Sequence, residues 1–213
     1  MSIPFLRRLG LTVSLCACAA LVQAESWPAA DWEVGVTPSG AAVEAFEAYS
    51  FAARDDANPV GVRTDAVLVI HDGKVIYERY AGPTKAGTPH LTWSVSKSLI
   101  SAVMGVAYAE GRFKLSDPVA MHYPPFAAHP QIKMGHLFNW ASGLDWQEGY
   151  ELAPLRSSVV AMLYTRGRDD MAAFTAAHQQ EVDPGTRFRY SSGDSTVIAA
   201  TLKSMVGPEA CPS

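Results

Sequence analysis

The sequence predicts a mixed α/β (α+β) fold in which one β-hairpin precedes a series of helices. The hairpin is indicated by two β-rich runs in residues 66–80, separated by Asp72-Gly73. This dipeptide tolerates the positive φ angles of a tight hairpin turn. Helices are indicated by apolar residues at helical spacing, most clearly in residues 94–110. An isolated hairpin is marginally stable in water, so we expect it to join a larger sheet or to pack on a helix.

The segment before the hairpin is expected to hold one helix. Residues 25–39 are rich in Trp, Pro and small residues without a period, which is typical of an irregular lead-in. Ser39 is the expected N-cap of an amphipathic helix over residues 42–54. This helix is a candidate cover for the hairpin.

Residues 94–110 are apolar on nearly every face, and Gly111 follows at the position of a C-cap. We therefore expect a helix that is buried at the centre of the fold. Shorter helices are predicted in three further places, which are the segment after the turn at 116–118, residues 132–141, and the segment from Asp169 or Asp170 to His178.

The last part of the chain is predicted to present a tyrosine and then form a helix. A turn at Asp183-Pro184-Gly185 leads into the extended residues 187–190, which deliver Tyr190 to a surface. Ser192 or Asp194 then caps a final apolar helix that ends near Gly207.

The composition is that of an ordinary globular protein and disfavours several classes of partner. The 213 residues are 48% hydrophobic and 18% charged, with a formal net charge of -4. No run of Lys or Arg interleaves with aromatic residues, so nucleic acid is not an expected partner. The histidines lack metal-ligand spacing, and the sequence contains neither a glycine-rich phosphate loop nor a G-x-S-x-G motif. We expect no metal and no cofactor.

The first 24 residues predict an export signal, and hence a periplasmic or secreted protein. Arg7 and Arg8 precede an apolar run over residues 9–22, and Ala24 offers a cleavage site. The alternative is lipoprotein processing at residues 15–18, which would leave a lipid anchor on Cys18. The apolar run is shorter than the roughly 20 residues of a membrane span, and no later segment qualifies. Cleavage would leave Cys211 alone, without an internal disulfide.

Ser94 and Lys97 form the first candidate catalytic pair. Three positions apart on a helix, they share one face, so the hydroxyl and the amine can meet. A serine needs a base to become a good nucleophile, and apolar surroundings favour the neutral amine that can act as one. The alternative is a solvated lysine near a helix start, because S-x-x-K also arises by chance. The scarcity of polar positions on this helix favours the catalytic interpretation.

The sequence Ser94-Val95-Ser96-Lys97, followed by Tyr190-Ser191-Ser192, resembles the serine β-lactamase and penicillin-binding-protein superfamily. Within it, the chain is most similar to class C β-lactamases, β-lactamase-fold carboxylesterases and 6-aminohexanoate-dimer hydrolases. Three supporting stretches stand in the right order, namely 66–80, 114–119 and 136–144. The resemblance implies a β-lactamase/transpeptidase-like fold with a helical subdomain. Residues 25–213 would form the N-terminal portion of a β-lactamase-related serine hydrolase domain.

The resemblance also implies a mechanism. Ser94 attacks a carbonyl, Lys97 and Tyr190 manage the proton, and water releases the acyl group. Ser192 stands where the superfamily often has an Asn that binds substrate, and its shorter hydroxyl favours esters or small amides over β-lactams. A β-lactamase or D,D-peptidase remains an alternative. So does a non-catalytic binding module or inactive remnant, in which Tyr190 is only a packed aromatic residue.

The superfamily continues well beyond the position of Ser213 in this chain. By the resemblance, the further part holds the strand with Lys-Thr-Gly or its equivalent, which supplies a second oxyanion-hole N–H. We therefore expect the sheet subdomain to be incomplete and this truncated chain to fold poorly and to have weak activity or none. In the loop after Ser142-Gly143, we expect Asp145, Trp146 and Tyr150 either to line a pocket or to pack.

Overall fold

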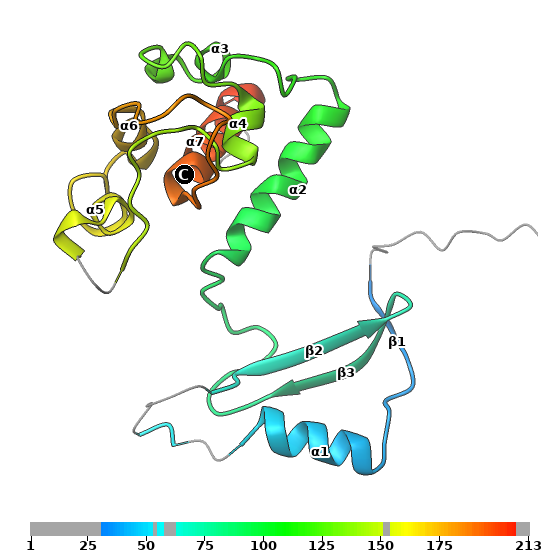
Figure 1. Ribbon diagram of the computed structural model, residues 1–213. Coiled ribbons are helices and arrows are strands. Elements are labelled where there is room, and N and C mark those ends of the chain that lie inside the picture. The colour runs from blue at the N-terminus through cyan, green and yellow to red at the C-terminus, as the bar shows by residue number, and fades with distance from the viewer. Residues whose placement is uncertain (1–30, 53–54, 58–62, 151–153, 208–213) are drawn as a thin grey trace, which may run out of the picture. The chain divides into compact units, whose positions relative to one another are not determined.

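The computed structural model describes residues 31–52, 55–57, 63–150 and 154–207. The chain divides into two compact units, Met1–His90 and Leu91–Ser213, and each is described by itself (Figure 1). The predicted export signal, the alternative lipid site at Cys18 and the lone Cys211 lie outside the described residues.

The first unit contains a three-stranded sheet in the order β1-β3-β2. Strands β2 (Ala66–His71) and β3 (Lys74–Tyr80) are antiparallel and form the predicted hairpin. Its turn has φ angles of 48° at Asp72 and 71° at Gly73, as the sequence predicted. Strand β1 (Glu33–Val34) pairs in parallel with β3. The expectation of a wholly irregular lead-in was therefore wrong, because a two-residue strand is too short to show a period.

Helix α1 (Ala41–Ser50) covers one face of the hairpin (Figure 1). The ring of Phe46 packs edge-on against Tyr77 of β3, with 5.5 Å between the centroids. The Tyr77 hydroxyl donates to Glu47 Oε1 at 2.8 Å, and Arg79 forms an ion pair with the same glutamate at 3.1 Å. This contact confirms the helix as the cover of the hairpin.

The ends of α1 differ from the prediction. Gly40, with φ of 102°, is the N-cap, and no side chain caps the helix, so the assignment of Ser39 was wrong. The helix ends at Ser50, before the predicted residue 54, and Phe51 N–H closes the last turn on Glu47 O.

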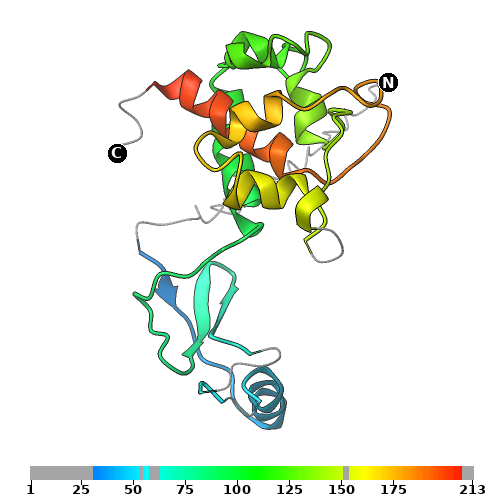
Figure 2. The same ribbon diagram turned by 90° about the vertical axis from the view of Figure 1, so that its left-hand side faces the viewer.

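The second unit is helical. Its elements are α2 (Val95–Ala109), α3 (Val119–His122), η1 (Pro124–Phe126), α4 (Met134–Phe138), η2 (Pro154–Arg156), α5 (Ser158–Tyr164), α6 (Met171–Ala176) and α7 (Ser192–Val206). Helix α7 contacts α2, α3, α4, α5 and α6, and Figure 2 shows it in orange and red among the shorter helices. Its Val197 and Ile198 join the main core with Met104, Phe126 and Leu137. No helix within the described ranges is long and apolar enough to span a bilayer.

Helix α2 is much less buried than its sequence predicted. Only Met104 and Ala107 are buried. Val95, Leu99, Val103 and Val106 repeat along one side of the helix and are 50–62% exposed. The expectation of a centrally buried helix was wrong for this face, which no other element of the second unit covers in the part that the structure describes. The boundaries agree better, since Gly111 follows the helix with φ of 71°.

Short polar side chains cap three helices of this unit. Asp170 accepts from Ala173 N–H at 2.8 Å and caps α6, which confirms one of the two predicted residues. Ser157 caps α5, a helix that the sequence analysis missed. The N-cap of α7 is Ser191, whose side chain accepts from Asp194 N–H, so the assignment to Ser192 or Asp194 was wrong by one to three positions. The helix predicted over residues 132–141 is the shorter α4.

We expect Gly143→Ala to destabilise the second unit by about 3 kcal/mol, because steric overlap in a packed region adds to a left-handed backbone. Gly143 has φ of +77°, and a Cβ there would lie 2.2 Å from Val182 O. Gly149→Ala is the matched control, since a Cβ at that position meets nothing within 4 Å. Urea unfolding of both variants tests the prediction, and equal midpoints would contradict it.

Candidate active site

Ser94 lies at the N-terminal end of α2, where it is the N-cap and is exposed. Val95 N–H donates to Thr92 O and Ser96 N–H to Trp93 O, so a tight turn leads into the helix. Trp93, next to the serine, has φ of 45°. A bulky residue in the left-handed region is strained, and such strain clusters at functional sites. The backbone around Ser94 therefore has the character of a built site.

The side chains of Lys97 and Tyr190 meet at Ser94, and Tyr190 comes from a distant part of the sequence. The Tyr190 hydroxyl donates to Ser94 Oγ at 2.9 Å, across 96 positions of the chain. Lys97 Nζ donates to the same oxygen at 3.3 Å. Nζ also lies 5.1 Å from the centroid of the Tyr190 ring. Each of two groups that can exchange a proton is thus within hydrogen-bond reach of the serine hydroxyl.

Tyr190 is held by Trp140, a residue that the sequence analysis did not single out. Their ring centroids are 4.4 Å apart, and Trp140 Nε1 donates to Ser195 Oγ of α7 at 3.1 Å. Trp140 O accepts from Arg189 N–H at 2.8 Å, and Trp140 itself has φ of 47°. The turn after α4 therefore supports the segment that presents the phenol.

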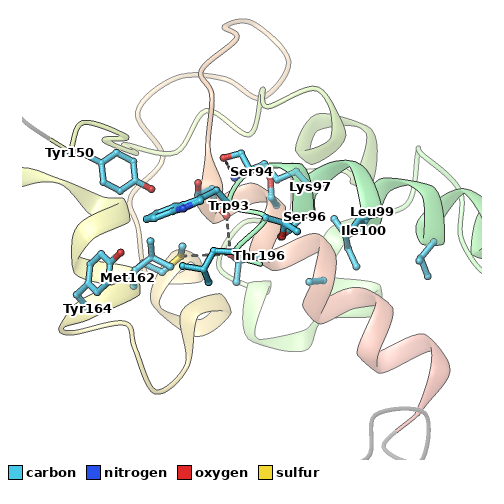
Figure 3. Close-up of a pocket in the computed structure, with 17 residues that line it drawn as sticks. Trp93, Ser94, Ser96, Lys97, Leu99, Ile100, Tyr150, Met162, Tyr164 and Thr196 are labelled. Atoms are coloured by element: carbon cyan, nitrogen blue, oxygen red, sulfur yellow. Dashed lines mark hydrogen bonds between the residues drawn. The ribbon is translucent and has the colours of Figure 1, made fainter. Parts of the chain in front are cut away.

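A cavity of about 910 Å³ opens beside Ser94 and Lys97. Figure 3 shows Trp93, Tyr150 and Tyr164 gathered on one side of it, together with Met162. Among the described residues that line it, Lys97 is the only charged one, and most of the others are apolar. A mostly apolar cavity with a few convergent polar groups is typical of a site for small molecules.

Ser192, the predicted substrate-binding residue, lines this cavity but is bonded to Glu148. Its Oγ donates to Glu148 Oε1 at 2.5 Å, and its N–H donates to Oε2 at 2.9 Å. Trp146 Nε1 donates to the same Oε2 at 2.5 Å. While it donates to Glu148, the Ser192 hydroxyl can act toward a bound molecule only as an acceptor.

Asp194 is almost completely buried, at 1% exposure, and its environment raises the pKa of the carboxyl from 3.8 to about 7. Burial is the main cause, and the nearby Glu148 adds to it, while hydrogen bonds from Ser142 and Ser191 act in the opposite direction. Oδ2 has no hydrogen-bond partner among the residues that the structure describes. The expectation that Asp194 only caps a helix was wrong, because its carboxyl bonds Ser142 in another segment.

The residues of the loop after Ser142-Gly143 were predicted either to line a pocket or to pack, and the structure shows both roles. Tyr150 lines the cavity. Trp146 packs in a second core cluster with Val159 and Met162. Asp145 Oδ1 bonds His178 Nδ1 at 2.8 Å and so links the loop to the end of α6. No group of three metal-ligand side chains occurs in the ranges that the structure describes.

Three residues of the site escaped the sequence analysis, namely Trp93, Trp140 and Glu148. Trp93 directly precedes the candidate nucleophile Ser94, and Glu148 lies two positions before Tyr150. Both are therefore close in sequence to residues that the sequence did single out. No spacing rule relates Glu148 to Ser192, however, because 44 positions separate them. The strained φ angles of the two tryptophans have no signature in the sequence.

Comparison with known proteins places the geometry in context. The family model named Beta-lactamase matches residues 52–205. A 6-aminohexanoate-dimer hydrolase from Paenarthrobacter ureafaciens is 27% identical over 151 residues, which are 68% of this chain and 38% of that protein. A solved structure of a Bacillus anthracis protein, assigned as a 6-aminohexanoate-dimer hydrolase, has a TM-score of 0.56 at 19% identity. That match covers 66% of this chain and 40% of the other. The chain thus spans about two fifths of the length of both relatives.

Proposed function

Because the chain belongs to the Beta-lactamase family and has its fold, we propose that it is a serine hydrolase that forms an acyl-enzyme on Ser94. The observation that carries the proposal is the meeting of three side chains, with Tyr190 OH at 2.9 Å and Lys97 Nζ at 3.3 Å from Ser94 Oγ. A hydroxyl with two proton-exchanging neighbours has what an activated serine requires.

In the proposed reaction, Ser94 Oγ attacks the carbonyl carbon of an ester or amide. The hydroxyl proton passes to Lys97 or Tyr190, whichever is in its basic form, and the carbonyl oxygen becomes an oxyanion. The Ser94 N–H, at the start of α2, has no acceptor among the described residues and is available to that oxyanion. Tyr190 then protonates the leaving oxygen or nitrogen as the bond to carbon breaks, which leaves the acyl group on Ser94. Water attacks this ester, and the serine recovers its proton as the acid departs.

Esters and small amides are the proposed substrates. The cavity beside Ser94 is mostly apolar, and Lys97 is the only charged residue in the described part of its lining. The Paenarthrobacter relative is named for hydrolysis of the 6-aminohexanoate dimer, which supports the small-amide branch of the proposal. The match to the Beta-lactamase family model favours a β-lactamase or D,D-peptidase as the second candidate.

Covalent labelling of the purified chain tests the proposal. We expect a fluorophosphonate to add to Ser94, as located by mass spectrometry, and p-nitrophenyl esters or the 6-aminohexanoate dimer to be hydrolysed slowly. A fluorescent penicillin, a chromogenic cephalosporin and a D-Ala-D-Ala peptide test the second candidate in parallel. If no reagent forms an adduct and no substrate is turned over, the proposal of a hydrolase is contradicted and a non-catalytic binding module is favoured.

We further propose export to the periplasm or the medium, on the basis of residues 1–24. The expected product begins at Glu25, which the N-terminal peptide of protein from fractionated cells identifies by mass spectrometry. A lipid on Cys18 would favour the alternative processing. Retention of residues 1–24 in the cytoplasm would contradict both.

A further inference from the structure

We propose that Asp194 is a positioning residue for Tyr190, because its buried carboxyl ties the residue after Tyr190 to the turn that contains Trp140. The inference rests on the proposed function, in which Tyr190 transfers the proton to the leaving group. It assigns no contact between Asp194 and substrate.

The carboxyl joins two separate segments through one oxygen atom. Asp194 Oδ1 accepts from Ser142 Oγ at 2.9 Å and from Ser191 Oγ at 3.1 Å. All three side chains are buried, with 1%, 4% and 2% exposure respectively. A hydrogen bond to a buried carboxyl is shielded from competition by water, so this junction is well defined.

Each serine in the junction is close in sequence to a ring of the site. Ser191 directly follows Tyr190, so fixing Ser191 restricts the direction of the phenol. Ser142 is two residues after Trp140, whose ring lies against Tyr190 with 4.4 Å between centroids. The bond from Arg189 N–H to Trp140 O joins the same two segments. Arg189 directly precedes Tyr190, whereas Ser191 directly follows it. The Tyr190 segment is therefore held on both sides of the tyrosine, by the Arg189 bond before it and by the Asp194 junction after it.

A role in capping alone does not explain this carboxyl. The side-chain cap of α7 is Ser191, whose Oγ accepts from the Asp194 backbone N–H at 2.9 Å and donates to Asp194 Oδ1 at 3.1 Å. An acidic residue in the first helical turn interacts with the helix dipole without being buried. Burial of a carboxyl costs free energy. The bond to Ser142, across 52 positions, is what the buried side chain adds.

Kinetics of Asp194→Ala and Asp194→Asn test the inference. Misplacing a reacting group costs about 10²-fold in rate, so we expect Asp194→Ala to lower kcat for a p-nitrophenyl ester by about that factor with little change in KM. Asp194→Asn keeps an oxygen that can accept from both serines and should retain most of kcat. Equal losses in the two variants would contradict the proposal. Circular dichroism at the assay temperature verifies that each variant is folded.

A double-mutant cycle separates positioning from general stability. In the Tyr190→Phe background the phenol is already absent, so Asp194→Ala should lower the residual rate by roughly threefold or less. Multiplicative effects of the two substitutions would overturn the positioning role. If Asp194→Ala does not fold, Ser142→Ala replaces it in the cycle, with an expected loss of about tenfold for one hydrogen bond.

The activity of the wild-type chain separates the role of Asp194 from the proposed function. An active wild type with multiplicative effects in the cycle would overturn the role of Asp194 and leave the proposed function intact. A wild type that neither turns over esters nor carries an adduct on Ser94 would overturn the proposed function and this inference with it.

Discussion

Ser94→Ala is expected to lower the hydrolysis of p-nitrophenyl esters by at least about 10³-fold, because loss of an activated nucleophile removes the covalent route. The three-group arrangement depends on this oxygen, which both Tyr190 OH and Lys97 Nζ bond. Initial rates at saturating ester, together with loss of the fluorophosphonate adduct, measure the effect.

Ser98→Ala is the matched control for this experiment. Ser98 lies on the same helix and is exposed, but it does not line the cavity beside Ser94. We expect its rate and labelling to equal those of the wild type. A Ser94→Ala variant that keeps its rate would show that another group carries the hydrolysis, and the fluorophosphonate adduct on the Ser94→Ala variant would then locate that group.

The parts of the fold that depend on neighbouring residues were predicted well. The hairpin turn needs only Asp72-Gly73, whose φ angles are both positive in the structure. The pairing of Ser94 with Lys97 needs only helical spacing, and Asp170 caps its helix with an interaction that spans three positions. The resemblance to the serine β-lactamase superfamily, drawn from several such local motifs, was confirmed by the family match over residues 52–205.

Local patterns did not predict the features that depend on distant residues. The approach of Tyr190 to Ser94 came from the resemblance alone, since 96 positions separate them. The apolar sequence of α2 predicted burial, yet burial depends on whether another element covers each face, and Leu99 is 59% exposed. Glu148 and Trp140 act through tertiary contacts with α7, which no periodicity encodes.

The distinction also explains why Asp194 was assigned the wrong role. An aspartate near the start of a helix is usually a cap, and the sequence around it favours that interpretation. The structure instead caps α7 with Ser191 and turns the carboxyl toward Ser142. A small difference in where the helix begins thus moves the carboxyl from the helix end into the protein interior.

The stability of the chain is expected to respond to the ionisation of Asp194. Its pKa is raised to about 7 in the folded protein, from 3.8, chiefly by burial. The folded state therefore holds a proton that the unfolded state releases between these two pH values. The contribution of Asp194 to the free energy of unfolding is fully present below about pH 4 and is lost as pH rises through 7. The difference between the two pKa values corresponds to about 4 kcal/mol.

Asp194→Asn isolates this contribution, because an amide does not ionise. Asp117 and Glu181 have lowered pKa values, through a hydrogen bond from Lys114 N–H and through bonds from Arg187 and Arg189 respectively. These two carboxylates make the protein less stable as pH falls, so the stability of the wild type alone mixes opposite trends. The contributions of Asp117 and Glu181 cancel when the free energy of unfolding of the variant is subtracted from that of the wild type. Relative to the wild type, we expect the free energy of unfolding of the variant to rise by about 4 kcal/mol between pH 4 and pH 8.

Urea unfolding at a series of pH values measures this difference. Above pH 7 the Asp194→Asn variant should be the more stable protein, because the wild type then holds a buried carboxylate whose Oδ2 has no partner in the described part of the chain. Asp183→Asn, which makes the same substitution at an exposed carboxyl in the turn before Tyr190, is the matched control for the change from Asp to Asn. Parallel curves for the wild type and Asp194→Asn would show that the buried carboxyl does not exchange its proton on unfolding in this range.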